Sequence, residues 1–268
     1  MTFPSFLSIF SALILSVVIA LLAKRAGALS RSGAWAAVGL GTIIFGFGGF
    51  RYTVILLVFF ISSSLLSRMF KTRKGDLEEK VAKGSRRDAW QVLANGALAG
   101  VFSLVGGLLG GDAWWWLFCA SMAAANADTW ATELGVFSKS DPRLITTFKQ
   151  VAKGTSGGIS PAGTASAFAG SLLIAFFAYI FQPDLLAGIL VALAGLLGSL
   201  FDSLLGATVQ VVYWCEVCAK ETEKTPLHGC GNNTRWLRGL HWLNNDWVNL
   251  GCTLSAPLIL VLLRLLAG

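Results

Sequence analysis

Long apolar stretches alternate with short polar connections along the whole chain. Uninterrupted stretches of the roughly 20 residues that a transmembrane helix needs cover residues 3–23, 92–111, 159–181 and 247–267. Shorter or interrupted stretches cover residues 34–49, 52–67, 113–137 and 185–212. The pattern predicts an all-α integral membrane protein, a bundle of about eight transmembrane helices. We expect residues 1–268 to form a single transmembrane domain.

Composition and charge agree with this class. Charged residues make up only 13% of the chain, about half of the fraction usual in soluble proteins. The net charge of +7 would suggest a nucleic-acid partner for a soluble protein, but lysines and arginines concentrate in every second connection. Cytoplasmic loops carry such an excess. The basic connections, including residues 213–246, are therefore predicted to be cytoplasmic and both termini external, with the lipid bilayer and not nucleic acid as the partner.

Two acidic residues, Asp128 and Asp202, interrupt predicted spans. An ionisable group inside a span is costly and usually marks a functional site, although a helix-packing role is the alternative. Both spans run toward the cytoplasm and both acids lie late in them, so the two carboxylates are expected at similar depth. Asn126, Thr129 and Glu133 share a helix face that Asp128 does not. Either the helix unwinds there, or a site wraps around more than one face.

Further polar residues begin the spans that start at the cytoplasmic side. The candidates for binding a nucleotide or phosphate are Arg86, Arg87, Asn95, Asn126, Thr129, Gly154, Thr155, Ser156, Gly157, Gly158, Asn245, Asp246 and Asn249. All of them collect at one side of the predicted bundle. A cytoplasmic active site at the membrane surface fits this distribution better than a transport path across the bilayer.

The glycine-rich segment 154–158 is the best candidate for a phosphate site. Glycines let backbone N–H groups approach an anion, and Ser160 followed by Pro161 predicts a helix start with free N–H donors. Lys153 adds a positive charge beside it. A flexible interhelical turn is the alternative, and the pattern of a Walker loop is absent.

Carboxylates next to a phosphate site imply a divalent cation, because they would otherwise repel the ligand. Mg²⁺ binds one or two carboxylates together with phosphate oxygens and water. We therefore predict Mg²⁺ ligation by Asp128 and Asp202, with Glu133 a third candidate, and a catalytic set that also includes Lys153. No strong general base is evident, which suits phosphoryl transfer to a phosphate, where catalysis is mostly positioning and charge neutralisation.

One connection contains cysteines and a histidine at the spacing of metal ligands. Cys215, Cys218, His228 and Cys230 could close a structural zinc site. An unliganded reduced cluster is the second interpretation. A disulfide is the least favoured, because a cytoplasmic loop is a reducing environment.

Five motifs together resemble a known family: NADTWATELG at 126–135, PRLITT at 142–147, GTSGGIS at 154–160, GSLFDSLLGA at 198–207 and NDWVN at 245–249. The family is the polytopic membrane family of phytyl-phosphate kinase of tocopherol synthesis and its uncharacterised transmembrane homologues. The resemblance implies phosphorylation of an isoprenyl monophosphate to its diphosphate, with CTP as the favoured donor. A cytidylyltransferase acting on a lipid phosphate, or a transporter that uses the two acids, are the alternatives.

Overall fold

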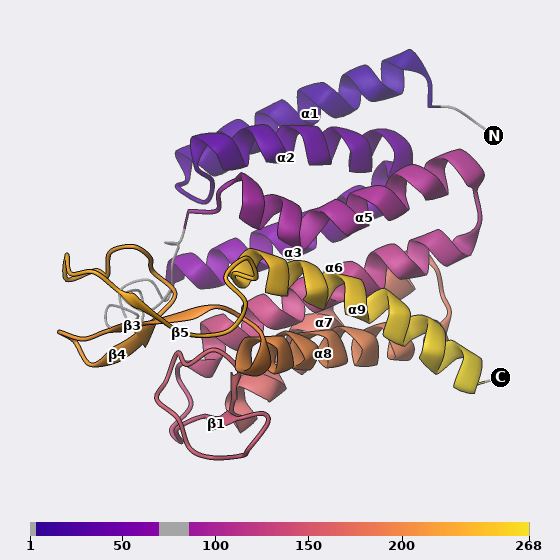
Figure 1. Ribbon diagram of the computed structural model, residues 1–268. Helices are drawn as coiled ribbons and strands as arrows, with labels where there is room; N and C mark the ends of the chain where they lie inside the picture. Colours follow the sequence, from indigo (N-terminus) through magenta and orange to yellow (C-terminus); the bar gives the residue numbers. More distant parts are fainter. Residues whose placement is uncertain (1–3, 70–85, 268) are drawn as a thin grey trace.

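The computed structural model describes residues 4–69 and 86–267, which fold mainly into long helices lying side by side (Figure 1). The helices are α1 (Phe6–Arg25), α2 (Arg31–Ile43), the π-helix η1 (Ile44–Gly48), α3 (Gly49–Met69), α5 (Ala89–Leu109), α6 (Asp112–Gly135), α7 (Pro161–Phe181), α8 (Leu185–Thr208) and α9 (Asn245–Leu266). Short strands occur only in the connections of the described part. The predicted class, an all-α membrane protein, is confirmed.

Six helical segments within the described residues are long and apolar enough to cross a membrane. Helix α6 is of similar length but is not among them, and it carries Asp112, Asp128 and Glu133. One of the six, Arg31–Met69, combines α2, η1 and α3. The predicted count of eight spans therefore stays a prediction.

The segment Arg31–Met69 is not one straight rod, because the chain reverses near Gly49, whose φ is +71° (Figure 1). Arg87 contacts both sides of this reversal. Its carbonyl accepts a hydrogen bond from the Ser30 N–H at 3.0 Å, and its guanidinium lies 3.5 Å from Ser64 Oγ. In a straight helix these two serines would lie roughly 50 Å apart at 1.5 Å per residue.

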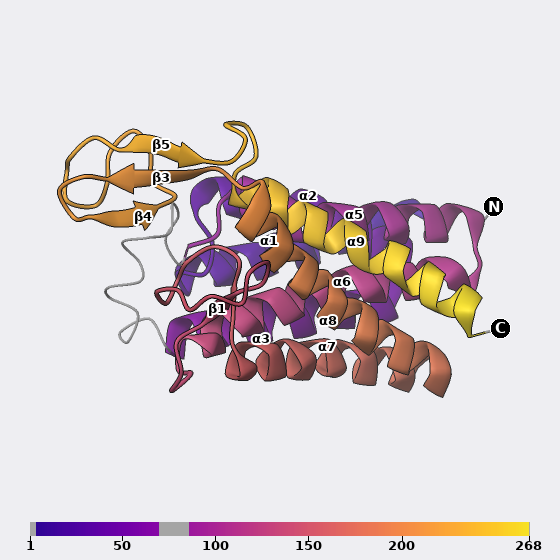
Figure 2. The same cartoon turned by 60° about the horizontal axis from the view of Figure 1, so that its bottom comes forward.

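The connections 26–30, 136–160 and 209–244 lie at one end of the bundle, and both chain termini lie at the other (Figures 1 and 2). We call the first end the loop end. The described basic connections share this end, as predicted, and the basic segment 70–85 lies outside the described residues. The assignment of the loop end to the cytoplasm stays a prediction.

Helix α6 occupies the centre of the bundle and contacts α3, α5, α7, α8 and α9. Small residues allow the closest of these approaches. A Cβ on Gly195 of α8 would lie 2.7 Å from Ala123 Cβ, and one on Gly198 would lie 2.9 Å from Ala124 Cβ. Such small-residue packing lets helix backbones approach closely in a membrane. It fixes α6 and α8 in a register that brings Asp128 and Asp202 to the same region.

Two small sheets lie at the loop end. Strands β1 (Arg143–Leu144) and β2 (Gly158–Ile159) pair antiparallel. Strands β3 (Val212–Cys215), β4 (Lys220–Thr222) and β5 (Arg235–Arg238) form an antiparallel sheet in the order β4-β3-β5. We call residues 211–240 the sheet unit, and it projects beyond the helix ends (Figure 2). Backbone bonds from the Val211 N–H to the Leu243 carbonyl and from the Leu240 N–H to the Val209 carbonyl, both 2.9 Å, join it to the bundle.

Candidate functional site

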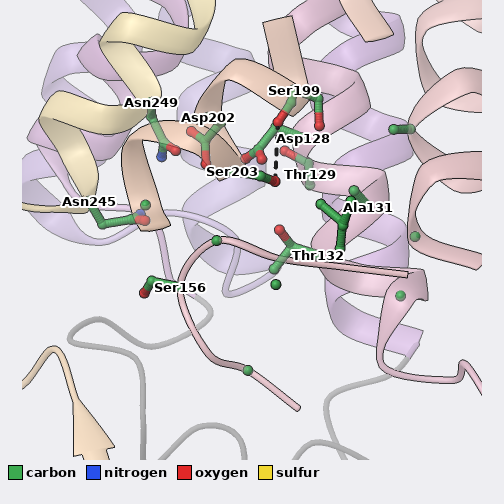
Figure 3. A pocket seen from close by; sticks show the side chains of 18 of the residues that line it. Asp128, Thr129, Ala131, Thr132, Ser156, Ser199, Asp202, Ser203, Asn245 and Asn249 are labelled. Carbon is green, nitrogen blue, oxygen red and sulfur yellow. Dashed lines mark hydrogen bonds between the residues drawn. The ribbon is translucent and has the colours of Figure 1, made fainter. Parts of the chain in front are cut away.

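A cavity of about 420 Å³ opens at the loop end between α5, α6, α8, α9 and the glycine-rich segment (Figure 3). It brings together most of the residues singled out from the sequence. These are Arg87, Asn95, Asp128, Thr129, Glu133, Lys153, Gly154, Thr155, Ser156, Gly157, Gly158, Asp202, Asn245, Asp246 and Asn249. Their convergence from five separate segments makes this cavity the candidate site, while the role of each residue stays a prediction.

Two carboxylates meet in the middle of this cavity. Asp128 of α6 and Asp202 of α8 face the same space (Figure 3) and lie close enough to repel each other electrostatically. The Oδ2 atom of Asp202 is buried and has no hydrogen-bond partner among the described residues. A buried carboxylate oxygen without a donor is costly and calls for an explanation. A divalent cation between the two acids fits this donor set, because hard cations select carboxylate oxygens.

Helix α6 is regular through the acid-containing motif, from Asp112 to Gly135. The site therefore wraps around more than one face of α6, with Asp128, Thr129 and Thr132 pointing into the cavity (Figure 3). Asn126 points elsewhere. Its side chain is fully buried, donates to the Gly170 carbonyl at 2.8 Å and accepts from Ser62 Oγ at 3.0 Å. It ties α6 to α7 and α3 and does not reach the cavity.

The glycine-rich segment packs against the end of α8. Gly157 has a φ of +86°, and a Cβ there would lie 2.5 Å from both the Cβ and the backbone N of Ala207. Only glycine fits this position without displacing the segment. The helix start predicted at Ser160 is confirmed, because Ser160 Oγ caps the Gly163 N–H at 3.1 Å and Pro161 begins α7.

Two cationic side chains are found among the described residues that line the cavity. Arg87 stacks over Phe59, with its guanidinium carbon 5.5 Å from the ring centre. Burial lowers the pKa of Arg87 to about 10, and the nearby Glu133 carboxylate opposes this shift, so Arg87 is charged at neutral pH. Lys153 Nζ donates to the carbonyls of Val136 at 3.3 Å and Ser138 at 2.7 Å. Lys153 therefore also joins the glycine-rich segment to the end of α6. Arg86 is exposed and is not part of the cavity lining.

The described lining of the cavity carries more acidic than basic side chains. Its described lining holds five carboxylates, from Asp128, Glu133, Asp202, Glu223 and Asp246, against the two cations Arg87 and Lys153. Carboxylates repel a polyphosphate unless a cation lies between them and the phosphates. The surplus of carboxylates thus supports a site for anion and metal together.

Several cavity residues escaped the sequence interpretation. Ser199 and Ser203 flank Asp202 on the apolar helix α8 (Figure 3), a local signal that sequence reasoning could have used. Gln210 and Glu223 carry no such signal. Glu223 accepts hydrogen bonds from Gln210 Nε2 at 2.7 Å and from Ser156 Oγ at 3.2 Å. Only the docking of the sheet unit on the bundle brings its carboxylate to the cavity.

The four predicted zinc ligands also converge, outside the cavity. The ligand atoms of Cys215, Cys218, His228 and Cys230 all lie within 4.8 Å of one another, and all of the cysteines are free thiols. Hydrogen bonds from Asn232 and His228 lower the pKa of the Cys230 thiol to about 6.

A second, apolar cavity of about 70 Å³ lies between α1, α2, α3 and α5. Its walls are mostly aliphatic and aromatic, among them Leu40 and Phe59. Arg87, Gln91 and Asn95 line both this cavity and the acidic one. A polar and an apolar compartment thus adjoin along the start of α5.

The fold is a bundle of membrane helices, and the glycine-lined polar cavity lies at one end of it. These features define a polytopic membrane protein with a polar site at the ends of its helices. Residues 14–257 match the family described as integral membrane protein DUF92, and the chain belongs to this family. The family resemblance inferred from the sequence motifs is confirmed.

Relatives of the chain come from plants and archaea. Protein PGR of Arabidopsis thaliana is 36% identical, over 92% of this chain and 93% of its own. An uncharacterised membrane protein of Methanocaldococcus jannaschii is also 36% identical, over 77% of this chain and 85% of its own. Protein VTE6, chloroplastic, of Arabidopsis thaliana is 28% identical, over 82% of this chain and 61% of its own. No solved structure matches the chain.

Proposed function

We propose that the protein is a CTP- and Mg²⁺-dependent kinase that phosphorylates phytyl phosphate or a related isoprenyl monophosphate to the diphosphate. The observation that carries the proposal is the junction of the two cavities at Arg87, Gln91 and Asn95. A lipid phosphate needs an apolar compartment for its chain and a polar one for its headgroup. The resemblance of the sequence motifs to the family of phytyl-phosphate kinase supports the same substrate class.

The acidic cavity would hold the nucleotide phosphates. Mg²⁺ on Asp128 and Asp202 would neutralise the charge on the transferring phosphoryl group. Backbone N–H groups of segment 154–158 would bind phosphate oxygens, as glycine-rich turns at helix starts do. The side chains of Asn245 and Asn249, which point into the cavity from α9 (Figure 3), add polar groups for orientation.

The lipid phosphate would lie at Arg87, with the first part of its chain in the apolar cavity. At about 70 Å³ this cavity is too small for a whole isoprenoid chain, so the remainder would extend along the bundle into the bilayer. A phosphate monoester has a second pKa near 6 and is largely dianionic at neutral pH. It needs little help from a base, and no histidine is found in the described lining of the acidic cavity.

A transport path is less well supported. Toward the opposite end, α6 buries large apolar side chains, among them Trp115, Phe118 and Met122, each 0% exposed. These side chains fill the bundle centre where a substrate would have to pass. A cytidylyltransferase would use the same cavity residues but attack the α-phosphate, so only its products distinguish it from a kinase.

The test incubates purified protein with Mg²⁺, a panel of isoprenyl monophosphates and CTP labelled at either the α- or the γ-phosphate. A kinase yields lipid diphosphate labelled from the γ-position, together with CDP. Lipid-linked CMP and released pyrophosphate would instead identify a cytidylyltransferase. Unchanged CTP with every lipid would contradict both enzymatic activities.

The two neighbouring arginines provide a matched pair for the lipid site. Arg87→Gln should raise the KM for the lipid phosphate by roughly 10- to 100-fold, the loss expected for a hydrogen bond to a charged group. Arg86→Gln removes the same charge from an exposed position outside the cavity and should change KM several-fold less. Equal effects of the two substitutions would argue for general attraction of anions and against a lipid site at Arg87.

A further inference from the structure

The cysteine and histidine cluster has the dimensions of a zinc site. Cys215 Sγ lies 3.6 Å from Cys230 Sγ, and His228 Nδ1 lies 3.2 Å from the same sulfur. Tetrahedral zinc with Zn–S bonds of about 2.3 Å separates two sulfurs by roughly 3.8 Å. The sulfur separation matches this value and is far longer than a disulfide bond of about 2.05 Å. Three thiols and one imidazole make a complete ligand set for a structural site.

The sheet unit has little else to hold it together. Its three strands contain four, three and four residues, and two of its buried side chains, Cys215 and His228, belong to the cluster itself. A sheet this small lacks the apolar core for independent stability and usually needs a metal or disulfides. In such units the free energy of metal binding becomes free energy of folding.

The same unit reaches the glycine-rich segment at two points. Glu223, directly after β4, accepts a hydrogen bond from Ser156 Oγ at 3.2 Å. Arg238, at the end of β5, donates to the carbonyls of Gly206 and Ala207 at 3.0 and 3.2 Å, and to the Ser156 carbonyl at 3.5 Å. Arg238 therefore ties the last turn of α8 to the segment that packs on it. The position of both residues depends on the fold of the sheet unit.

We propose that Cys215, Cys218, His228 and Cys230 bind one Zn²⁺, and that this metal keeps Glu223 and Arg238 in place on the glycine-rich segment. The zinc lies outside the cavity, but it positions two residues, Glu223 and Arg238, that contact the glycine-rich segment of the cavity wall. The inference stands on the sheet unit and its contacts, and it does not depend on which reaction the cavity performs.

The first experiment measures metal content in the full-length protein purified without chelator. We expect about one zinc per chain, and after replacement by Co²⁺ the absorption bands of tetrahedral thiolate coordination. Cys215→Ser combined with Cys218→Ser should remove the metal. Glu216 lies between the two cysteines and is exposed; it pairs with Arg235 at 2.7 Å and accepts a hydrogen bond from Trp214 Nε1 at 3.3 Å. Glu216→Gln changes none of the four ligands and should retain the zinc. Absence of zinc and of Co²⁺ binding in the wild type overturns the proposal.

The second experiment follows amide hydrogen exchange in residues 153–160. Zinc removal should speed exchange there by roughly tenfold or more, the scale of losing a hydrogen bond to a charged group. Arg238→Met should have the same effect while the zinc stays bound, and Arg238→Lys should restore part of the protection. These variants separate positioning from folding, because the metal content reports that the sheet unit is intact. Unchanged exchange after zinc removal overturns the link to the cavity.

Discussion

Replacement of Asp202 by Asn is the sharpest perturbation of the acidic cavity. The substitution keeps the size of the side chain and removes one negative charge from a position where Asp128 and Glu223 both act repulsively. The buried Oδ2 atom has no donor among the described residues. If the acid pair is a metal site, the negative charge of Asp202 stabilises the protein only when the metal is bound. If Asp202 supports the fold, the charge is needed always.

The two cases differ in thermal stability. A ligand at 100 times its dissociation constant stabilises the folded state by about 2.7 kcal/mol. For a chain of this size, each kcal/mol raises Tm by about 2–4 °C. Mg²⁺ should therefore raise the Tm of the wild type by roughly 5–11 °C, and Asp202→Asn should lose most of this shift. Without added Mg²⁺ the variant should be at least as stable as the wild type, because the repulsion between neighbouring carboxylates is relieved.

The assay is thermal unfolding in detergent at pH 7.5, with either excess MgCl₂ or no added divalent cation, because EDTA would also remove the zinc proposed for the sheet unit. Asp184→Asn is the matched control at the opposite end of α8. Asp184 caps the Ala187 N–H at 2.9 Å, and asparagine is an equally good cap, so its Mg²⁺ shift should equal that of the wild type. A full Mg²⁺ shift in Asp202→Asn would refute the metal assignment. A large loss of stability relative to the wild type without added Mg²⁺ would instead show that Asp202 is a structural acid.

Three further predictions concern other parts of the molecule. Gly157→Ala should weaken nucleotide binding by tenfold or more, because it adds about 1–2 kcal/mol of left-handed backbone strain and a clash with Ala207. Gly110→Ala introduces the same backbone strain but no clash, so it should leave binding unchanged. A titration with a fluorescent nucleotide measures both affinities. Asn126→Ala should lower stability by about 1–3 kcal/mol, since it removes two buried hydrogen bonds, to the Gly170 carbonyl and Ser62 Oγ, yet keep the Mg²⁺ shift in Tm. All ten lysines lie in the basic connections, so a membrane-impermeant amine reagent should modify lysine peptides only in inside-out vesicles. Labelling of lysines from the outer side would show that the membrane topology is the opposite of the predicted one.

The sequence by itself determined the class of protein and most of the candidate site. Apolar stretches reveal membrane helices because the bilayer accepts few other structures, and the basic connections reveal which helix ends lie together. These one-dimensional signals were enough to place Asp128, Asp202 and segment 154–158 in one region. The same signals could not settle the number of spans, because only Arg51 separates the apolar stretches 34–49 and 52–67, and the reversal at Gly49 is a local backbone event.

Only the tertiary structure decided which neighbouring residues face the cavity. Asn126 lies two positions from Asp128, but the rotation of about 100° per residue in a helix points it toward Ser62 and Gly170. Glu223 is distant in the sequence from every other cavity acid, and the docking of the sheet unit brings it in. The face that each helix turns toward its neighbours, and the way separate segments pack, depend on contacts between residues far apart in the sequence. The linear pattern records which residues are available, and the fold decides which of them meet.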